Sequence, residues 1–226
     1  MDRRIIDYYD RLAPSYDADR FGNSYGRFLD AQERALLARL LPAGADRVLD
    51  LGCGTGRLSD RASHACDASV ESLRAAAARH ASGRFCAADI AALPFRAESF
   101  DAAFSFHVFM HLDRAAIQAA FAEVARVLRP GGVFIADVAS ALRRRLLRRA
   151  TSGWHGGTSL TREEFAAIGA DVGLRMTDCV GIMLAPIHRL PRALRAPIVA
   201  MDRHLAALAP DLASYIVGRF VRDARR

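Results

Sequence analysis

The 226-residue sequence predicts an α/β fold in which a doubly wound, mostly parallel sheet carries helices on both faces. Three observations support this prediction. Short apolar strands alternate with helical segments between residues 47 and 138, a glycine-rich loop follows the first of those strands, and two apolar segments late in the chain are separated by an insertion. The apolar fraction of 52% is sufficient for a packed core.

The first 45 residues read as helical. Between Arg27 and Leu41 the apolar residues fall along one stripe, and Pro42 with Gly44 ends that helix. The segment before it is rich in aromatic side chains, at Tyr8, Tyr9, Tyr16, Phe21 and Tyr25. We therefore expect a helical, aromatic segment ahead of the sheet.

The middle and last thirds of the chain give the expected sheet and its helices. Strands are expected at residues 47–51, 84–88, 100–106, 133–138, 174–184 and 214–222. A helix should begin after the N-cap Asp113 and end near Leu128, where residues 129–132 break it, and a capping box at Thr161 predicts another helix to about Val172. We expect the last two strands, separated by a partly helical insertion, to pair antiparallel at the sheet edge.

The most informative segment is the run Val48–Gly56, with the sequence VLDLGCGTG. Alternate glycines let the backbone turn tightly and let a ligand approach the main chain, and we expect a helix start after the loop to offer amides to an anion. The dinucleotide fingerprint GxGxxG would need glycine at position 57, where this chain has Arg57. Because Asp50 favours a cation, the pattern indicates a ligand with both an ammonium and a carboxylate group.

This segment resembles the cofactor loop of the class I S-adenosylmethionine-dependent methyltransferases, in particular the bacterial small-molecule enzymes. The likeness covers about residues 46–138 in the family's order, through Cys66–Ser69, Ala88–Ile90, Leu93–Phe95, Phe100–Leu112 and Leu128–Gly132. It implies a Rossmann-like, seven-stranded sheet with an antiparallel edge hairpin, and S-adenosylmethionine as cofactor. It further implies one methyltransferase domain over 1–226, with a helical lid at 1–45, a cofactor-binding core at 46–138, and substrate-side elements at 139–226 that include an inserted lid at 185–212.

The resemblance also assigns roles to residues. Asp67 would take the ribose hydroxyls, with Glu71 as the alternative, because the ten residues from Arg57 to Cys66 leave room only for a one-turn helix and a very short strand. Tyr16 would cover the cofactor and Arg27 would pair with its carboxylate, although aromatic packing and a surface arginine explain them equally well. The predicted cofactor-binding set is Tyr16, Arg27, Asp50, Gly52, Cys53, Gly54, Gly56, Asp67, Ala68, Asp89, Ile90 and Ser105.

Methyl transfer from a sulfonium requires alignment and exclusion of water, and it requires a base only if the nucleophile arrives protonated. His107 and His155 are the predicted catalytic residues, because they follow strands whose ends should border the methyl site. Trp154 and His188 are the predicted substrate contacts. No metal site is expected, because the four cysteines and the histidines lack metal-ligand spacing.

The net charge of +7 keeps a nucleic-acid partner open, but all 32 basic residues are arginine, which weakens charge as evidence for a phosphate-binding surface. We expect a small-molecule acceptor methylated on oxygen or nitrogen; the alternatives are an RNA methyltransferase and a non-catalytic cofactor-binding protein. No apolar run is long enough to cross a membrane and none resembles a signal peptide, so cytoplasmic residence is expected. The oligomeric state does not follow from the sequence.

Overall fold

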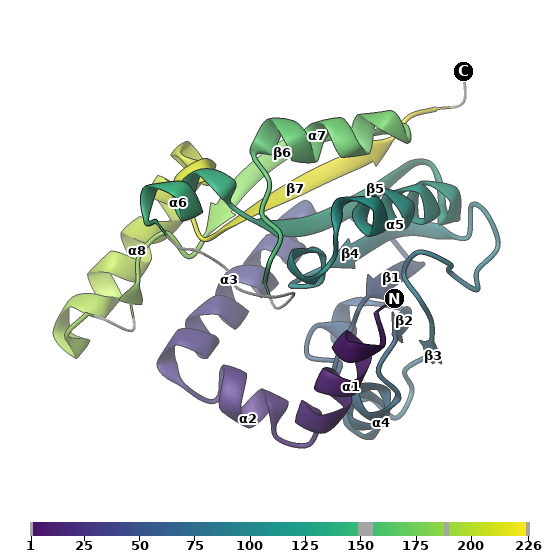
Figure 1. Ribbon diagram of the computed structural model, residues 1–226, viewed down its shortest axis with the longest axis horizontal. Helices are drawn as coiled ribbons and strands as arrows, with labels where there is room; N and C mark the ends of the chain where they lie inside the picture. The colour runs from purple at the N-terminus through teal and green to yellow at the C-terminus, as the bar shows by residue number, and fades with distance from the viewer. Residues whose placement is uncertain (1, 149–155, 188–189, 225–226) are drawn as a thin grey trace.

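The computed structural model describes residues 2–148, 156–187 and 190–224 (Figure 1). Its sheet has the strand order β3-β2-β1-β4-β5-β7-β6. Strands β1 to β5 pair in parallel, whereas β7 runs antiparallel to both β5 and β6. The predicted mostly parallel sheet with its antiparallel edge pair is therefore confirmed. The strands are β1 (Val48–Leu51), β2 (His64–Asp67), β3 (Phe85–Ala87), β4 (Phe100–Ser105), β5 (Leu128–Ala139), β6 (Leu174–Ile182) and β7 (Tyr215–Arg222).

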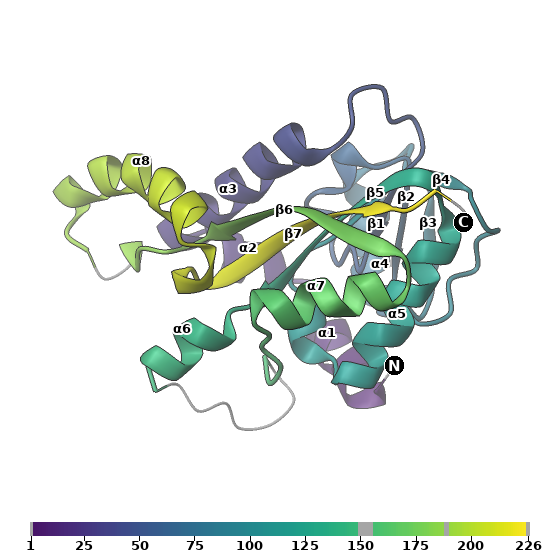
Figure 2. The same cartoon turned by 90° about the horizontal axis from the view of Figure 1, so that it is seen from above.

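Helices cover both faces of this sheet, and Figure 2 shows α3 and α8 on one side with α5 and α7 on the other. On the α3 face, Phe28, Leu29 and Leu37 pack against buried residues of the central strands. On the α5 and α7 face, five phenylalanine side chains form the centre of the core. The helices are α1 (Arg3–Leu12), α2 (Tyr16–Phe21), α3 (Ser24–Leu40), α4 (Val70–Arg79), α5 (Arg114–Val127), α6 (Ala141–Leu146), α7 (Arg162–Asp171) and α8 (Arg192–Leu208).

The expected helix caps are present. The Asp113 carboxylate accepts a hydrogen bond of 2.8 Å from the backbone N–H of Ala116 at the start of α5. At the start of α7, Thr161 and Glu164 form both hydrogen bonds of a capping box. The sequence pattern thus located the beginnings of both helices correctly.

The predicted end of α5 is confirmed, since this helix stops at Val127, but the next strand begins earlier than expected. Strand β5 begins at Leu128, so residues 129–132 lie within the strand instead of in a separate turn. Residues 129–131 are exposed, the pairing with β4 shifts register there, and Arg129 forms an ion pair of 3.0 Å with Asp101 beside it. The Arg-Pro-Gly-Gly run at residues 129–132 therefore forms an irregular start of a long strand and not a separate turn.

The glycine loop after β1 is followed by a single 3-10 turn, Ser59–Arg61, and not by an α-helix. The short connection to β2 forces this outcome, and it removes the α-helix start that the sequence pattern led us to expect beneath an anionic group. Helix α3 lies beside the loop instead. Arg34 of α3 donates hydrogen bonds to the carbonyl of Arg57 and to the Asp60 carboxylate.

The insertion that leads from β6 to β7 packs against α3 through buried polar groups. The side-chain amide of Gln32 on α3 donates a hydrogen bond of 2.7 Å to Asp202 of α8. The oxygen of the same amide accepts a hydrogen bond of 3.0 Å from the backbone N–H of Met183. Arg195 reaches Ser24 at 2.9 Å. Among the described residues, no helix is long and apolar enough to cross a membrane.

Replacing Phe121 by alanine should destabilise the fold by about 3–5 kcal/mol, because a fully buried aromatic side chain would leave a cavity. Its ring centroid lies 5.2–5.7 Å from those of the four other phenylalanines of this cluster, Phe109, Phe134, Phe165 and Phe220. Urea unfolding followed by circular dichroism measures the change. Leu208→Ala is the control, since this side chain is 83% exposed, and a loss of similar size in both variants would contradict the assignment of the core.

Candidate active site

Three adjoining cavities lie at the carboxyl ends of β1, β2 and β4, beneath the N-terminal helices. Their volumes, counted to their open mouths, are about 680, 450 and 690 Å³. Tyr16 and His107 line all three, so these two side chains stand where the cavities meet. Open α/β sheets bind ligands at this edge, which makes the cavities the candidate active site.

The glycine loop supplies the wall between the first and second cavities. Gly52, Gly54 and Gly56 all have positive φ angles, of 72°, 54° and 76°. A Cβ atom on Gly52 would lie 2.4 Å from the Val108 side chain, whereas one on Gly54 would meet no protein atom within 4 Å. Gly52 is therefore required by the protein's own packing. Gly54 instead leaves space on the side of the cavities.

Asp67, at the end of β2, faces the first cavity with its carboxylate held by the main chain. Its two oxygens accept hydrogen bonds of 2.8 Å from the backbone N–H groups of Gly54 and Ser69. Glu71, the alternative ribose ligand, forms an ion pair of 2.5 Å with Arg74 on the exposed side of α4. The structure thus brings Asp67, and not Glu71, to the cavity.

The other predicted residues of this region divide in two. Ala68 and Ile90 line the first cavity. Asp89 does not, and its carboxylate accepts a hydrogen bond of 2.9 Å from the backbone of Ala91 within a tight turn. Ser105 is fully buried at the end of β4 outside the three cavities, and among the described residues its hydroxyl has no hydrogen-bond partner.

Asp50 lies at the bottom of the second cavity with Gly52 and Cys53. It is almost completely buried, and its carboxylate accepts a hydrogen bond of 2.7 Å from Ser59. Burial raises the pKa of Asp50 to about 7, against the opposing effect of the Ser59 hydrogen bond. A buried carboxylate of this kind is stabilised in its charged form by a cationic ligand group.

The predicted role of Arg27 does not agree with its position. Its guanidinium donates to the Gly22 carbonyl at 2.5 Å, and the side chain lines a neighbouring outer hollow but not the second cavity itself. Arg57 lines that cavity instead, with its guanidinium 4.1 Å from the centre of the Phe21 ring. The sequence signal for Arg57 was its position directly after the glycine run, which we used only to exclude a dinucleotide.

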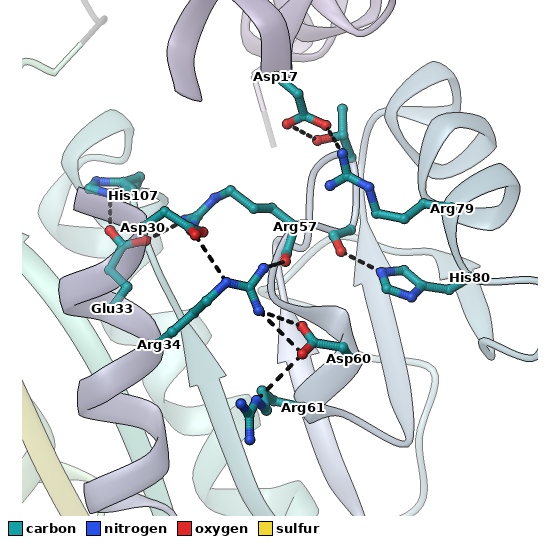
Figure 3. A network of polar contacts seen from close by, with 12 residues as sticks. Asp17, Asp30, Glu33, Arg34, Arg57, Asp60, Arg61, Arg79, His80 and His107 are labelled. Atoms are coloured by element: carbon teal, nitrogen blue, oxygen red, sulfur yellow. Dashed lines mark hydrogen bonds and ion pairs between the residues drawn. The ribbon is translucent and has the colours of Figure 1, made fainter. Parts of the chain in front are cut away.

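Arg57 belongs to a polar network that joins α3 to the glycine loop (Figure 3). Asp30 and Glu33, one turn apart on α3, both form ion pairs with its guanidinium, the first at 2.5 Å. On the other side of the loop, Asp17 of α2 accepts a hydrogen bond of 2.8 Å from Thr55 and pairs with Arg79 of α4. The lid helices are therefore attached to the loop at two points.

His107 follows β4 with a positive φ of 61° and points both ring nitrogens at carboxylates. Its Nε2 atom lies 2.5 Å from Glu33, and its Nδ1 atom lies 3.4 Å from Asp137 of β5. The backbone N–H of His107 also donates to Asp137 at 2.7 Å. Neither Glu33 nor Asp137 was identified from the sequence, because an isolated acid on a helix or strand carries no motif.

The charges of this group support one another. Burial alone would lower the pKa of His107, but Glu33 and Asp137 raise it above its ordinary value. Burial alone would raise the pKa of Glu33, but His107 and Arg57 hold it below its usual range. Burial raises the pKa of Asp137 to about 6. The two carboxylates thus favour the protonated form of His107. The predicted general base has no ring nitrogen turned toward an acceptor's proton.

One further histidine and the remaining predicted residues are placed as follows. His111 is bound on both sides, by the Tyr9 hydroxyl at 2.9 Å from Nε2 and by the Gly156 backbone N–H at 3.0 Å from Nδ1. Tyr16 is half-buried and packs edge-on against Tyr9 and Phe21. Trp154, His155 and His188 lie outside the described residues.

Comparison with known proteins identifies the domain. Residues 49–136 match the family model described as "Methyltransferase domain". The malonyl-[acyl-carrier protein] O-methyltransferase of Pectobacterium atrosepticum is 33% identical over 138 residues, which cover 57% of this chain and 54% of that protein. The chain spans about half the length of the first curated relatives that it matches.

Solved structures share the fold over nearly the whole chain. A methyltransferase of Thermotoga maritima, described as a possible histamine N-methyltransferase, aligns with a TM-score of 0.68 at 18% identity, covering 97% of each chain. The [4+2]-cyclase SpnF aligns with a TM-score of 0.69 at 19% identity, covering 98% of this chain and 96% of its own. At these identities the likeness concerns the fold alone.

The sheet order, the glycine loop with its acids and the matched domain agree with one another and confirm the resemblance found in the sequence. Residues 49–136 of the protein match a methyltransferase domain, and the fold of the chain is the one found in S-adenosylmethionine-dependent methyltransferases.

Proposed function

We propose that the protein transfers a methyl group from S-adenosylmethionine to an oxygen or nitrogen atom of a small-molecule acceptor. The observation that carries this proposal is the meeting of three cavities at Tyr16 and His107. The two cavities on either side of the glycine loop suit the two ends of the cofactor. The third, lined by α1, α2 and the turn after β4, is of a size that suits a small acceptor better than a nucleic-acid strand.

The residues present fit the cofactor. In the first cavity Asp67 keeps free lone pairs for the ribose hydroxyls, and Ile90 and Ala68 offer an apolar surface to the adenine. In the second, Asp50 would take the ammonium group and Arg57 the carboxylate of the methionine end. When bound, the cofactor supplies an electrophilic methyl group on sulfonium. Gly54 leaves room for it, since a Cβ atom there would point into open space.

The protein's own groups would act mainly by positioning. Tyr16 covers the meeting point of the cavities, and the ties from Asp17 to Thr55 and Arg79 hold the lid over the loop. A site covered in this way would align the reactants and limit the access of water, which can supply much of the acceleration of a displacement reaction. His107 would contribute a fixed positive charge, held by Glu33 and Asp137.

A direct test measures binding and turnover separately. Calorimetry with S-adenosylhomocysteine should give saturable 1:1 binding, and incubation with methyl-labelled S-adenosylmethionine and small-molecule cell extract should transfer label to an acceptor. The cyclase neighbour makes the second measurement essential, because the fold alone does not establish transfer. Absence of any affinity for S-adenosylhomocysteine would refute the proposal.

Gly54→Ala should abolish measurable binding of S-adenosylhomocysteine while lowering stability by only about 1–2 kcal/mol, the cost of a left-handed alanine. Gly44→Ala is the matched control. Gly44 has a φ of 74° and a Cβ atom there would also meet nothing within 4 Å, but it lies in an exposed turn away from the cavities. If both variants bind the ligand equally well, Gly54 does not face the cofactor.

Asp50→Asn should weaken S-adenosylhomocysteine binding about 10- to 100-fold, the effect of losing one charged hydrogen bond. Ser59 can still donate to the amide oxygen, so the fold should persist. Because the pKa of Asp50 is raised to about 7, the carboxyl is protonated below that pH and ionised above it. Wild-type affinity should therefore rise from pH 6 to pH 8, and the variant should show no such rise.

Calorimetry at three pH values with Asp171→Asn as an exposed control measures this dependence. A wild-type affinity that falls with increasing pH would contradict the assignment of Asp50 to the ammonium group.

Glu33→Gln should lower the pKa of His107, because the nearer of its two carboxylates would be lost. It should also destabilise the fold by about 3–5 kcal/mol, since the guanidinium of Arg57 would lose a buried partner. NMR titration of the His107 ring and urea unfolding measure the two effects. An unchanged titration of His107 would show that Glu33 does not set its charge.

A further inference from the structure

We propose that the acceptor is a carboxylic acid with an apolar body, that Arg20 binds its carboxylate, and that the methyl group is transferred to a carboxylate oxygen. This inference rests on the proposed function and assigns a substrate class to the third cavity. Its support is a half-buried arginine without an acidic partner, a second cation on the same cavity, and a lack of strong, accessible bases among the described residues around it.

The third cavity has an apolar, aromatic wall with two cationic groups. Tyr8, Tyr9, Leu12 and Met110 contribute its apolar surface, from α1 and from the turn after β4. Arg20 of α2 and His107 contribute the charge. Because Tyr16 and His107 also line the two other cavities, a ligand held by these cations would lie beside the point where all three meet.

Arg20 differs from the other arginines near the site in its partners. It is half-buried and lies close to the hydroxyl groups of Tyr16, Tyr25 and Tyr215. Within the described part of the chain it forms no ion pair, whereas Arg34 and Arg57 are each paired with two carboxylates. Asp19, which lines the same cavity, accepts a hydrogen bond of 2.7 Å from Ser15.

An arginine withdrawn from water ordinarily has an anionic partner, and its planar guanidinium matches the two oxygens of a carboxylate. The second cation strengthens the argument. The carboxylates of Glu33 and Asp137, 2.5 and 3.4 Å from its ring nitrogens, favour the protonated form of His107, and Arg20 is near enough to oppose that charge. An anion in the third cavity would reduce the repulsion between Arg20 and His107, whereas an acceptor with an ammonium group would be repelled by both.

The described groups around the cavity offer no strong, accessible base, and the one carboxylate that lines it, that of Asp19, is a weak base that accepts a hydrogen bond from Ser15. Both ring nitrogens of His107 face carboxylates, and both of His111 are hydrogen-bonded to Tyr9 and Gly156. Burial raises the pKa values of Tyr9 and Tyr16, so these hydroxyls stay protonated. An acceptor that is ionised before it binds needs no base, and a carboxylic acid with a pKa of about 4 meets this condition at neutral pH.

The transfer step is balanced without a proton. A carboxylate oxygen forms a bond to the methyl carbon while the bond from that carbon to sulfur breaks, and the electron pair of the broken bond stays on sulfur. The anionic acceptor becomes a neutral methyl ester, and the sulfonium becomes the uncharged thioether of S-adenosylhomocysteine. The aromatic wall removes water from the carboxylate, which is a weak nucleophile when hydrated.

The experiment uses 3-phenylpropionate, 4-phenylbutyrate and octanoate, each compared with its primary amide, which has a similar shape and no charge. Calorimetry on the protein saturated with S-adenosylhomocysteine measures binding of each compound. Turnover with methyl-labelled S-adenosylmethionine is followed by alkali treatment, because methyl esters release labelled methanol while methyl ethers and methylamines do not. We expect at least one acid to bind about 10- to 100-fold more tightly than its amide and to give alkali-labile product.

Arg20→Met should remove the preference for the acid over the amide, and Arg20→Lys should retain part of it. Affinity for S-adenosylhomocysteine should stay unchanged in both, which also shows that the variants fold. Arg11→Met is the matched control, because Arg11 is an exposed arginine of the lid that lines none of the three cavities.

Three results would overturn the inference while leaving the proposed function intact: no acid binds better than its amide, the methylated product survives alkali, or Arg20→Met keeps the preference. Loss of S-adenosylhomocysteine binding in Arg20→Met alone would place Arg20 at the cofactor and overturn it as well. If the wild type itself does not bind S-adenosylhomocysteine, the proposed function fails.

Discussion

The buried carboxylate of Glu33 is the interaction on which the site depends. It is completely inaccessible to water and lies between two cations, Arg57 beside the glycine loop and His107 after β4. Removing a carboxylate from water is costly, and only well-placed positive partners offset that cost. The three groups therefore fix one another, and with them the positions of α3, the loop and the end of the central strand.

This arrangement also compensates for a shortened connection. In place of an α-helix after the glycine loop the chain has one 3-10 turn, so the loop lacks the support that such a helix would give. The side chains of Arg34 and Glu33 reach the loop from α3, and Asp17 reaches it from α2. The segment that covers the site thereby also takes part in shaping its floor.

The sequence predicted those features that depend on local pattern. The mostly parallel sheet with its antiparallel edge pair, the caps at Asp113 and Thr161, the short turn before β2 and the position of Asp67 follow from periodicity, from spacing and from one ordered set of motifs. The acidic partners of His107 did not follow, because Glu33 lies 74 positions away and meets it only through tertiary packing. Arg57 was not identified as a cavity residue for the same reason, since its place beside the second cavity depends on the tertiary fold.

Two adjacent residues of α3, Gln32 and Glu33, contact different parts of the protein. Gln32 binds Asp202 and the backbone of Met183 in the insertion, while Glu33 binds the loop and His107. One helical turn thus links the insertion between β6 and β7 to the charged groups at the centre of the site. Sequence changes in the insertion that tilt this turn would alter the charge and alignment of His107 without replacing any group that touches a ligand. A scaffold of this kind can therefore change its acceptor while its cofactor-binding residues stay the same.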